Sequence, residues 1–237
     1  MVKRRKIFFS LLLVMSFSLS YSVPSDTTSI IDNIYNFNFL KAKELLSFNS
    51  EKNIILNETL NLEMCWWMAL ESENKDRFSE FLNRLDHFEK GSNNNLTEII
   101  SATYRMRYYA CTNKKYRLPF LLVKINYNLK NVNITELENS DPEENELFIL
   151  YRSFLDLIQV NYSVEKLLSD SGKKQVLIDR IESVIRCGSL TNKTIGRYFL
   201  MKYYLDIEKD KSKAFSFITV LHEQYPKNKI FAQLLTN

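Results

Sequence analysis

The hydrophobic residues of this chain recur at helical spacing from Ser29 onward. In the clearest stripe, apolar side chains follow one helix face at Phe78, Phe81, Leu82, Leu85 and Phe88. The same spacing returns in three later segments, at 118–129, 177–185 and 214–221. No comparable run alternates with a period of two. The pattern therefore predicts an all-α protein.

Residues typical of helix ends divide this pattern into eleven helices. Asn95 with Glu98 resembles a capping box, and Asp141 precedes a first-turn proline. Gly188 stands where a helix C-terminus is expected. The expected helices are 27–36, 38–48, 54–72, 75–90, 96–112, 116–131, 142–161, 173–187, 192–207, 211–225 and 228–235. Since the connections between them are short, we expect antiparallel neighbours paired as helical hairpins.

One of these helices is apolar on every side over residues 64–70. Trp66 and Trp67 project about 100° apart on a helix, so neighbours must pack on two sides to cover both. The inner helix of a stacked array offers that environment. We therefore expect both tryptophans in the core of stacked hairpins. An exposed aromatic platform for a ligand is the alternative.

The first 22 residues have the layout of a secretory signal peptide. A basic cluster at 3–6 precedes an apolar run at 7–19, and Ser20-Tyr21-Ser22 supplies the small residues of a cleavage site. The apolar run is shorter than the about 20 residues that a membrane span needs. The sequence thus predicts a signal peptide over 1–22 and one helical domain over 26–237. The protein is expected in the periplasm, the cell envelope or the extracellular space, with an uncleaved anchor as the alternative.

The formal net charge of +4 comes from this leader. Residues 1–22 hold four basic and no acidic side chains, so the remainder is balanced at 28 of each sign. A nucleic-acid-binding protein would keep a positive excess, and that class is excluded. Residues 131–146 carry no basic side chain, and 131–141 is a candidate hinge. Residues 173–237 carry a net charge of +6, which would suit an acidic partner or would simply be a solvated surface.

Catalytic chemistry has little support in this sequence. The two histidines, His87 and His222, fall on helices rich in charged residues and are expected near the surface. The acidic residues of 136–146 are explained by solvation and helix capping. No enzyme activity, metal or cofactor is therefore predicted.

The three cysteines are widely spaced and form no CxxC pair. Cys65, Cys111 and Cys187 each fall within a predicted helix beside apolar residues. A cysteine in such a position commonly behaves as a small buried hydrophobe, which we expect for all three. Their redox state stays open, because one pair could still oxidise in an exported protein.

Two stretches, one at 34–46 and one made of 198–205, 209–215 and 225–228, resemble exported bacterial tetratricopeptide-repeat-like proteins. The first is IYNFNFLKAKELL at 34–46, which is followed by the paired tryptophans. The second comprises YFLMKYYL at 198–205, KDKSKAF at 209–215 and Tyr225-Pro226-Lys227-Asn228. The resemblance covers about 30–80 and 190–235 and is weak between them. Motifs of this kind specify packing and not chemistry.

The resemblance implies an array of stacked hairpins, a solenoid or superhelix. Ala42 and Ala214 would be the small residues that let paired helices approach closely, and they lie about five repeats of 34 residues apart. Pro226 would end the second helix of a unit. With the two tryptophans, these three residues are assigned to the structural core. Lys202 departs from the pattern, which expects a small residue there.

The fifth expected helix carries the candidate binding residues. Leu96 and Ile99 belong to its apolar face, whereas Arg105, Tyr108 and Tyr109 project toward the opposite side. In a solenoid one helix of each hairpin lines a concave groove, and Tyr and Arg are frequent interface anchors. These three residues are predicted to bind a partner. Packing against a neighbouring hairpin is the alternative.

Together these features predict an exported scaffold or adaptor that binds a protein or peptide partner in the cell envelope. Its affinity would come from desolvated aromatic anchors within a charged rim, without a cofactor. A small-molecule- or glycan-binding accessory protein using the same groove is one alternative. An envelope enzyme is the other, and it would need convergent histidines or carboxylates with shifted pKa values.

Overall fold

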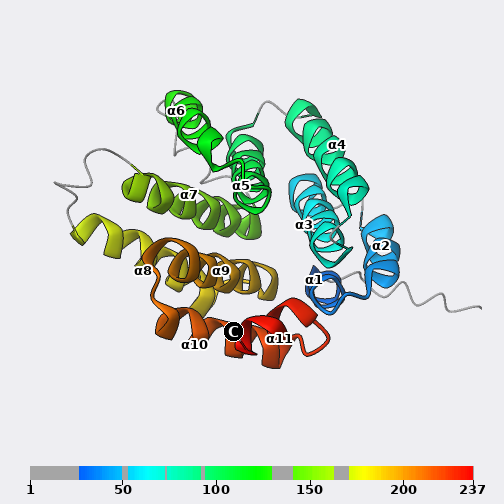
Figure 1. Cartoon of the computed structure of the whole chain (residues 1–237). Coiled ribbons are helices and arrows are strands. Elements are labelled where there is room, and N and C mark those ends of the chain that lie inside the picture. Colours follow the sequence, from blue (N-terminus) through cyan, green and yellow to red (C-terminus); the bar gives the residue numbers. More distant parts are fainter. Residues whose placement is uncertain are drawn as a thin grey trace, which may run out of the picture.

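The computed structural model describes residues 27–49, 53–72, 74–91, 94–129, 141–162 and 171–236 (Figure 1). All regular structure in these segments is helical, which confirms the all-α prediction. The predicted signal peptide over 1–22 and the candidate hinge, except Asp141, lie outside the described residues. Among the described helices, none combines the length and the apolar character that crossing a membrane requires.

Eleven α-helices are present in the described residues, in close agreement with the expected ranges. They are α1 (Thr27–Tyr35), α2 (Phe39–Phe48), α3 (Ile54–Ser72), α4 (Lys75–Gly91), α5 (Asn95–Cys111), α6 (Leu118–Leu129), α7 (Pro142–Tyr162), α8 (Ser171–Cys187), α9 (Leu190–Tyr203), α10 (Lys211–Gln224) and α11 (Lys229–Thr236). A 3₁₀ turn, η1 (Lys115–Arg117), leads into α6, and a π-helical turn, η4 (Tyr204–Glu208), follows α9.

Side-chain caps account for several helix starts. Asn94, and not the predicted Asn95, caps α5 by accepting a hydrogen bond from the Leu96 amide at 2.6 Å. Asp141 caps α7 as expected, accepting from the Glu143 amide at 2.8 Å. Ser189 caps α9, and this helix begins two residues earlier than predicted. The Asn94 and Ser189 caps thus place the helix starts earlier than predicted, by one residue for α5 and by two residues for α9.

The helices form two layers. Helices α1, α3, α5, α7 and α9 lie inside, and their partners α2, α4, α6, α8 and α10 lie outside (Figure 1). Ten residues are buried on each of α3 and α9, whereas three are buried on each of α4 and α10. The inner helices are therefore covered on several sides, and the outer helices on one stripe only.

The first helix packs against the last part of the chain. Helix α1 contacts both α3 and α9, and Asn228 Nδ2 donates a hydrogen bond to the Tyr35 carbonyl oxygen at 3.0 Å. The Tyr35 ring centroid lies 5.0 Å from that of Tyr225 and 6.2 Å from that of Phe231. An extended array would leave the first helix uncovered on one side. Here the inner helices instead follow a closed circuit (Figure 1).

Four of the five predicted core residues are buried. The side chains of Trp66 and Trp67 are 2% and 0% exposed to solvent, which confirms their predicted burial. Ala42 and Ala214 are also buried. Pro226 is exposed, so its assignment to the core was wrong. It lies in the turn directly after α10, where it contacts solvent.

None of the three cysteines is fully buried, so the predicted burial was wrong. Cys65 is half-buried, while Cys111 and Cys187 are exposed. Each of the latter two is the last residue of its helix, α5 and α8, where the chain leaves the packed layer. His87 is exposed and His222 half-buried, as expected from their charged surroundings.

Candidate functional site

Arg105, the first predicted binding residue, bridges α5 to α4. Its Nη2 lies 2.7 Å from Asp86 Oδ1, and its Nε donates to Glu89 Oε2 at 3.1 Å. Burial alone would lower the pKa of Arg105, but the hydrogen bonds to Glu89 and Asp86 outweigh burial and raise it. Both carboxylates thus already engage this guanidinium within the fold, which matches the packing alternative for this residue.

Tyr108 and Tyr109 form a cluster with two cations. Lys114 Nζ donates to the Tyr108 hydroxyl at 3.2 Å and lies 5.1 Å from the centre of its ring. Arg117 Cζ lies 5.8 Å from the centre of the Tyr109 ring. The two rings are 5.9 Å apart, and both tyrosines are half-buried. We call these four residues the tyrosine–cation cluster.

Both tyrosines also pack against the core of the fold. The Tyr108 ring lies 6.0 Å from that of Phe78 on α4, and the Tyr109 ring contacts Tyr108 and Arg117. The three predicted residues share one face of α5, yet Arg105 turns to the carboxylates of α4. All three side chains are half-buried, and the carboxylates of α4 engage only Arg105 among them.

Next to this cluster, the inner helices converge on a single buried carboxylate, Glu63 of α3. Its Oε1 accepts hydrogen bonds from the Tyr35 hydroxyl and from Trp67 Nε1, both at 2.8 Å. Its Oε2 accepts from the Tyr104 hydroxyl at 2.6 Å and from Arg107 Nη1 at 2.7 Å. Glu63 is fully buried, and these donors come from α1, α3 and α5.

Arg107 extends the network to a fourth inner helix through aromatic contacts. Its guanidinium carbon lies 4.7 Å from the ring centre of Tyr198 on α9 and 4.8 Å from those of Trp66 and Tyr104. A guanidinium over aromatic faces is attracted by the ring quadrupole, most strongly where water is excluded. Arg107 thereby joins α3, α5 and α9 around the centre of the molecule.

The pKa values at this centre keep the pair charged and the tyrosines neutral. Burial would raise the pKa of Glu63, but the Arg107 charge and the hydrogen bonds from Arg107, Tyr104 and Tyr35 lower it. Burial would likewise lower the pKa of Arg107, but Glu63 holds it well above its usual range. Burial, followed by the Glu63 charge, raises the pKa of Tyr35 and Tyr104. Fixed charge states of this kind support positioning and offer no group poised for proton transfer near neutral pH.

The sequence carried a signal for this pair that the prediction overlooked. On α3, Glu63 follows the buried residues Leu56 and Leu60 at the spacing of one helix face. On α5, Arg107 falls on the same face as Ile99 and Ile100. A charged residue centred in an apolar stripe usually needs a buried partner of opposite charge.

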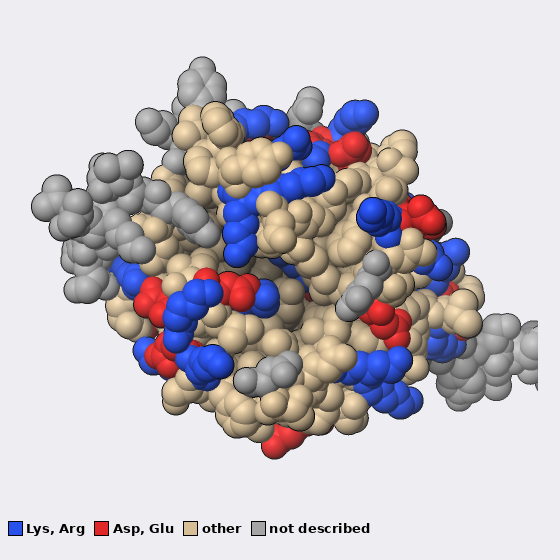
Figure 2. All heavy atoms as spheres, viewed as in Figure 1, with Lys and Arg blue, Asp and Glu red and all other residues tan. Residues whose placement is uncertain are grey.

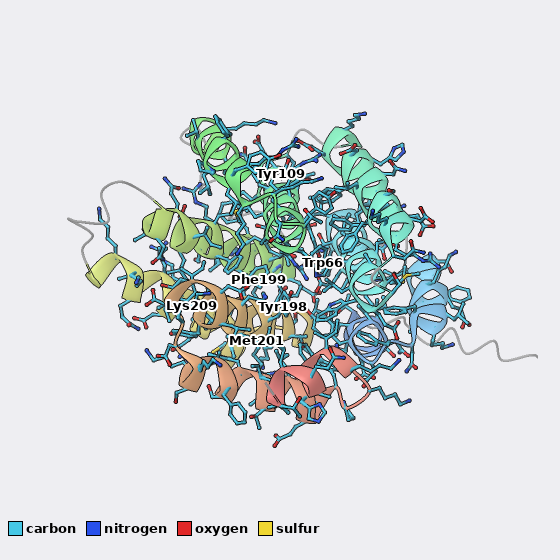
Figure 3. All side chains as sticks on the ribbon, in the orientation of Figure 1. Trp66, Tyr109, Tyr198, Phe199, Met201 and Lys209 are labelled. Carbon is cyan, nitrogen blue, oxygen red and sulfur yellow. The ribbon has the colours of Figure 1, made fainter. Side chains whose placement is uncertain are left out.

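The face that carries the tyrosine–cation cluster is hollowed at its centre. Figure 2 shows this hollow, with Lys and Arg side chains along part of its border. Figure 3, in the same orientation, places Tyr109 beside α5 and α6 and Trp66 and Tyr198 nearer the centre. The hollow thus lies among the inner helices, next to aromatic and basic side chains.

Residues suited to metal binding do not gather in the described part of the chain. No three His, Cys, Asp or Glu side chains there lie close enough together to hold a metal ion.

Glu146, one of the acidic residues expected to be solvated or capping, accepts hydrogen bonds from the Ser189 amide at 2.9 Å and from Asn192 Nδ2 at 3.0 Å. It therefore holds the start of α9 against α7.

Comparison with known proteins does not extend this description. No protein-family model, no curated protein and no solved structure matches the chain. The fold and the site accordingly define an all-α protein of paired helices with a buried Glu–Arg centre and a neighbouring tyrosine–cation cluster.

Proposed function

We propose that this chain is an exported, tetratricopeptide-like scaffold that binds a protein or peptide partner in the cell envelope. The paired helices and the buried Ala42 and Ala214 support a repeat-like construction. The contact between α1 and the C-terminal helices departs from an open array. The partner is therefore proposed to bind the hollowed face and not an extended superhelical groove.

The observation that carries this proposal is the tyrosine–cation cluster. Tyr108 and Tyr109 lie next to each other beside Lys114 and Arg117, and Figure 3 places Tyr109 beside α5 and α6. Tyrosine supplies a large rigid contact area together with a hydroxyl for hydrogen bonds, and arginine adds multiple donors. A peptide that carries acidic and aromatic side chains would complement both.

An affinity capture from envelope extract tests the proposal. The chain and its Tyr109→Ala, Arg117→Glu double variant are used as baits. We expect a specific protein to be captured by the first and lost with the second, because the anchor and the charge at the rim are both removed. Melting temperatures measured in parallel should be nearly equal, since both side chains are only partly packed.

The matched control is Lys213→Glu on α10. Lys213 Nζ also lies 5.1 Å from a tyrosine ring centre, that of Tyr204, so the control makes the same charge change at a similar contact elsewhere. It should capture the same protein as the unmodified chain. If all three baits capture identical proteins, the cluster is not the binding site.

A further inference from the structure

Helix α6 is apolar on two opposite sides. Leu118, Leu122 and Ile125 are buried on the side that faces α5. Phe120 and Val123 project from the opposite side and are 78% and 70% exposed. Tyr116 in the preceding turn η1 is 66% exposed. An outer helix of a water-soluble layer is expected to be polar on that side, so these three side chains need an explanation.

Helix α4 follows the expected pattern on its outer side. On α4, the residues buried against the inner layer are Phe81, Leu85 and Phe88, and the exposed positions between them include Asn83 and His87. Exposed apolar side chains also occur on α2, where Leu40 is 89% exposed, and on α10, where Phe215 is 51% exposed. Helix α6 differs from these because its segment, 112–129, has basic residues and no acidic one. We call Tyr116, Phe120 and Val123 the α6 outer patch.

The segment that carries the patch has charges of one sign. Between Thr112 and Leu129 the chain has four basic residues and no acidic one: Lys114, Lys115, Arg117 and Lys124. Lys115 and Arg117 are exposed, and Lys124 lies 3.7 Å from Glu89 of α4 with 64% of its side chain open to solvent. An exposed apolar patch with basic neighbours is therefore complementary to an apolar surface that carries negative charge.

We propose that the α6 outer patch docks onto an anionic lipid surface. Helix α6 lies at the edge of the molecule (Figure 1), and Phe120 and Val123 are exposed on the side away from α5. Helices that lie in the plane of a bilayer combine aromatic and aliphatic side chains on one face with Lys and Arg beside them. Basic residues near the surface add attraction to anionic lipids.

An acidic protein segment is the main competitor, and the shape of the patch argues against it. Peptide-binding sites offer a groove or an unpaired strand edge that surrounds the apolar side chains of the peptide. Phe120 and Val123 instead stand out from the helix with most of their surface free. A bilayer interface covers such protruding side chains without a matching cavity.

Vesicle sedimentation with the protein purified after export tests the proposal. Vesicles of phosphatidylcholine alone are compared with vesicles that also contain phosphatidylglycerol. We expect binding to the anionic vesicles, weakened by added salt. The Phe120→Asp, Val123→Asp variant should lose this binding. Lys115→Gln and Lys124→Gln should each weaken it, by about fivefold per cation removed.

Two control variants distinguish binding through the α6 outer patch from nonspecific vesicle binding and from binding at the proposed partner site. Phe215→Asp on α10 changes an apolar residue that is 51% exposed elsewhere and should bind anionic vesicles as the unmodified chain does. Tyr109→Ala should also retain vesicle binding, whereas the α6 variant should retain partner capture. The two proposals can therefore fail independently.

Several results would overturn the proposal. The proposal is wrong if the unmodified chain does not bind anionic vesicles. It is also wrong if the Phe120→Asp, Val123→Asp variant binds them as well as the unmodified chain does. A dimer that the α6 variant abolishes, without any vesicle binding, would assign the patch to a second copy of the chain. Binding of an acidic aromatic peptide at the patch in place of vesicles would assign it to a protein partner.

Discussion

Glu63 and Arg107 form an ion pair between α3 and α5 whose side chains are 0% and 8% exposed. The same carboxylate also accepts the Tyr35 hydroxyl of α1, and the guanidinium lies over Tyr198 of α9. A buried charge is tolerated only when it is paired and hydrogen-bonded. The relative positions of four inner helices therefore depend on this one pair.

Replacing Glu63 by Gln should strongly destabilise the protein. The substitution preserves size but leaves the Arg107 charge buried without a counter-charge, which costs about 3–5 kcal/mol. Denaturant unfolding with an unchanged m-value measures this change.

Two further variants make that measurement specific. Glu80→Gln removes the acidic partner of an exposed pair, Arg77–Glu80 at 2.7 Å, and should change stability by less than about 1 kcal/mol. Glu63→Gln combined with Arg107→Met removes both charges and should recover part of the loss. Equal stability of the Glu63→Gln and Glu80→Gln variants would contradict the role assigned to the Glu63–Arg107 pair.

Stability should fall in acid because of Glu63. Its pKa is lowered in the folded protein, by Arg107 and the hydrogen-bond donors against the opposing effect of burial, from an ordinary value of 4.5. The contribution of Glu63 is therefore present above that value and is lost as the pH falls through the folded pKa. Thermal melts between neutral and acidic pH should show this decline, and Glu63→Gln should show a smaller one.

Stability should also fall in alkali because of Tyr225. Burial raises its pKa from 10.0 to about 12, against the lowering effect of the hydrogen bond with Thr194. Between these values the unfolded chain releases a proton that the folded chain keeps, so stability falls by about 1.4 kcal/mol per pH unit from this group. Tyr225→Phe should reduce the slope by one proton, and Tyr116→Phe, at a side chain that is 66% exposed, serves as the control. Equal slopes in all three proteins would refute the assignment.

Gly196→Ala should destabilise the protein although alanine favours helices. A Cβ atom at this position of α9 would lie 2.9 Å from Ile185 Cγ1 of α8 and 3.2 Å from Leu150 Cδ1 of α7. Overpacking of this kind costs about 1–3 kcal/mol, which exceeds or offsets the helix-propensity gain of about 1 kcal/mol. Gly91→Ala, where a Cβ meets nothing within 4 Å, is the control and should be neutral or stabilising in chemical denaturation.

Lys209→Gly should stabilise the protein. Lys209 has a φ of 61° where the chain leaves η4, a left-handed conformation that costs a non-glycine residue about 1 kcal/mol. Glycine relieves this cost, and a rise of a few degrees in melting temperature would report it. The same substitution at Lys211, inside the first turn of α10, should lower the melting temperature. A fall at both positions would argue against strain at Lys209.

Local pattern was sufficient to predict the helices, because apolar spacing and capping side chains act within a few residues. Trp66 and Trp67 also revealed two-sided burial, since adjacent positions on a helix point in different directions. The bonds between distant parts of the chain were not predictable in this way. Periodicity shows that α1 has an apolar face, but it does not show that the C-terminal helices cover it.

The candidate site was predicted in part for the same reason. Arg105, Tyr108 and Tyr109 do share a helix face, as their spacing indicates. The carboxylates that engage Arg105 come from α4, and the cations beside the tyrosines come from the turn after α5. Such pairings depend on how neighbouring helices are rotated, which a single sequence does not specify.

The Asn228–Tyr35 hydrogen bond has a consequence for how the molecule comes apart. A linear array of hairpins frays from its ends, because each terminal unit has one neighbour. Here the first unit has neighbours on both sides, so detaching α11 would uncover Tyr35 and Trp67 at the opposite end of the sequence. Unfolding of the C-terminal helix would therefore remove packing contacts from the N-terminal helices. The described helices should accordingly melt together in a single cooperative step.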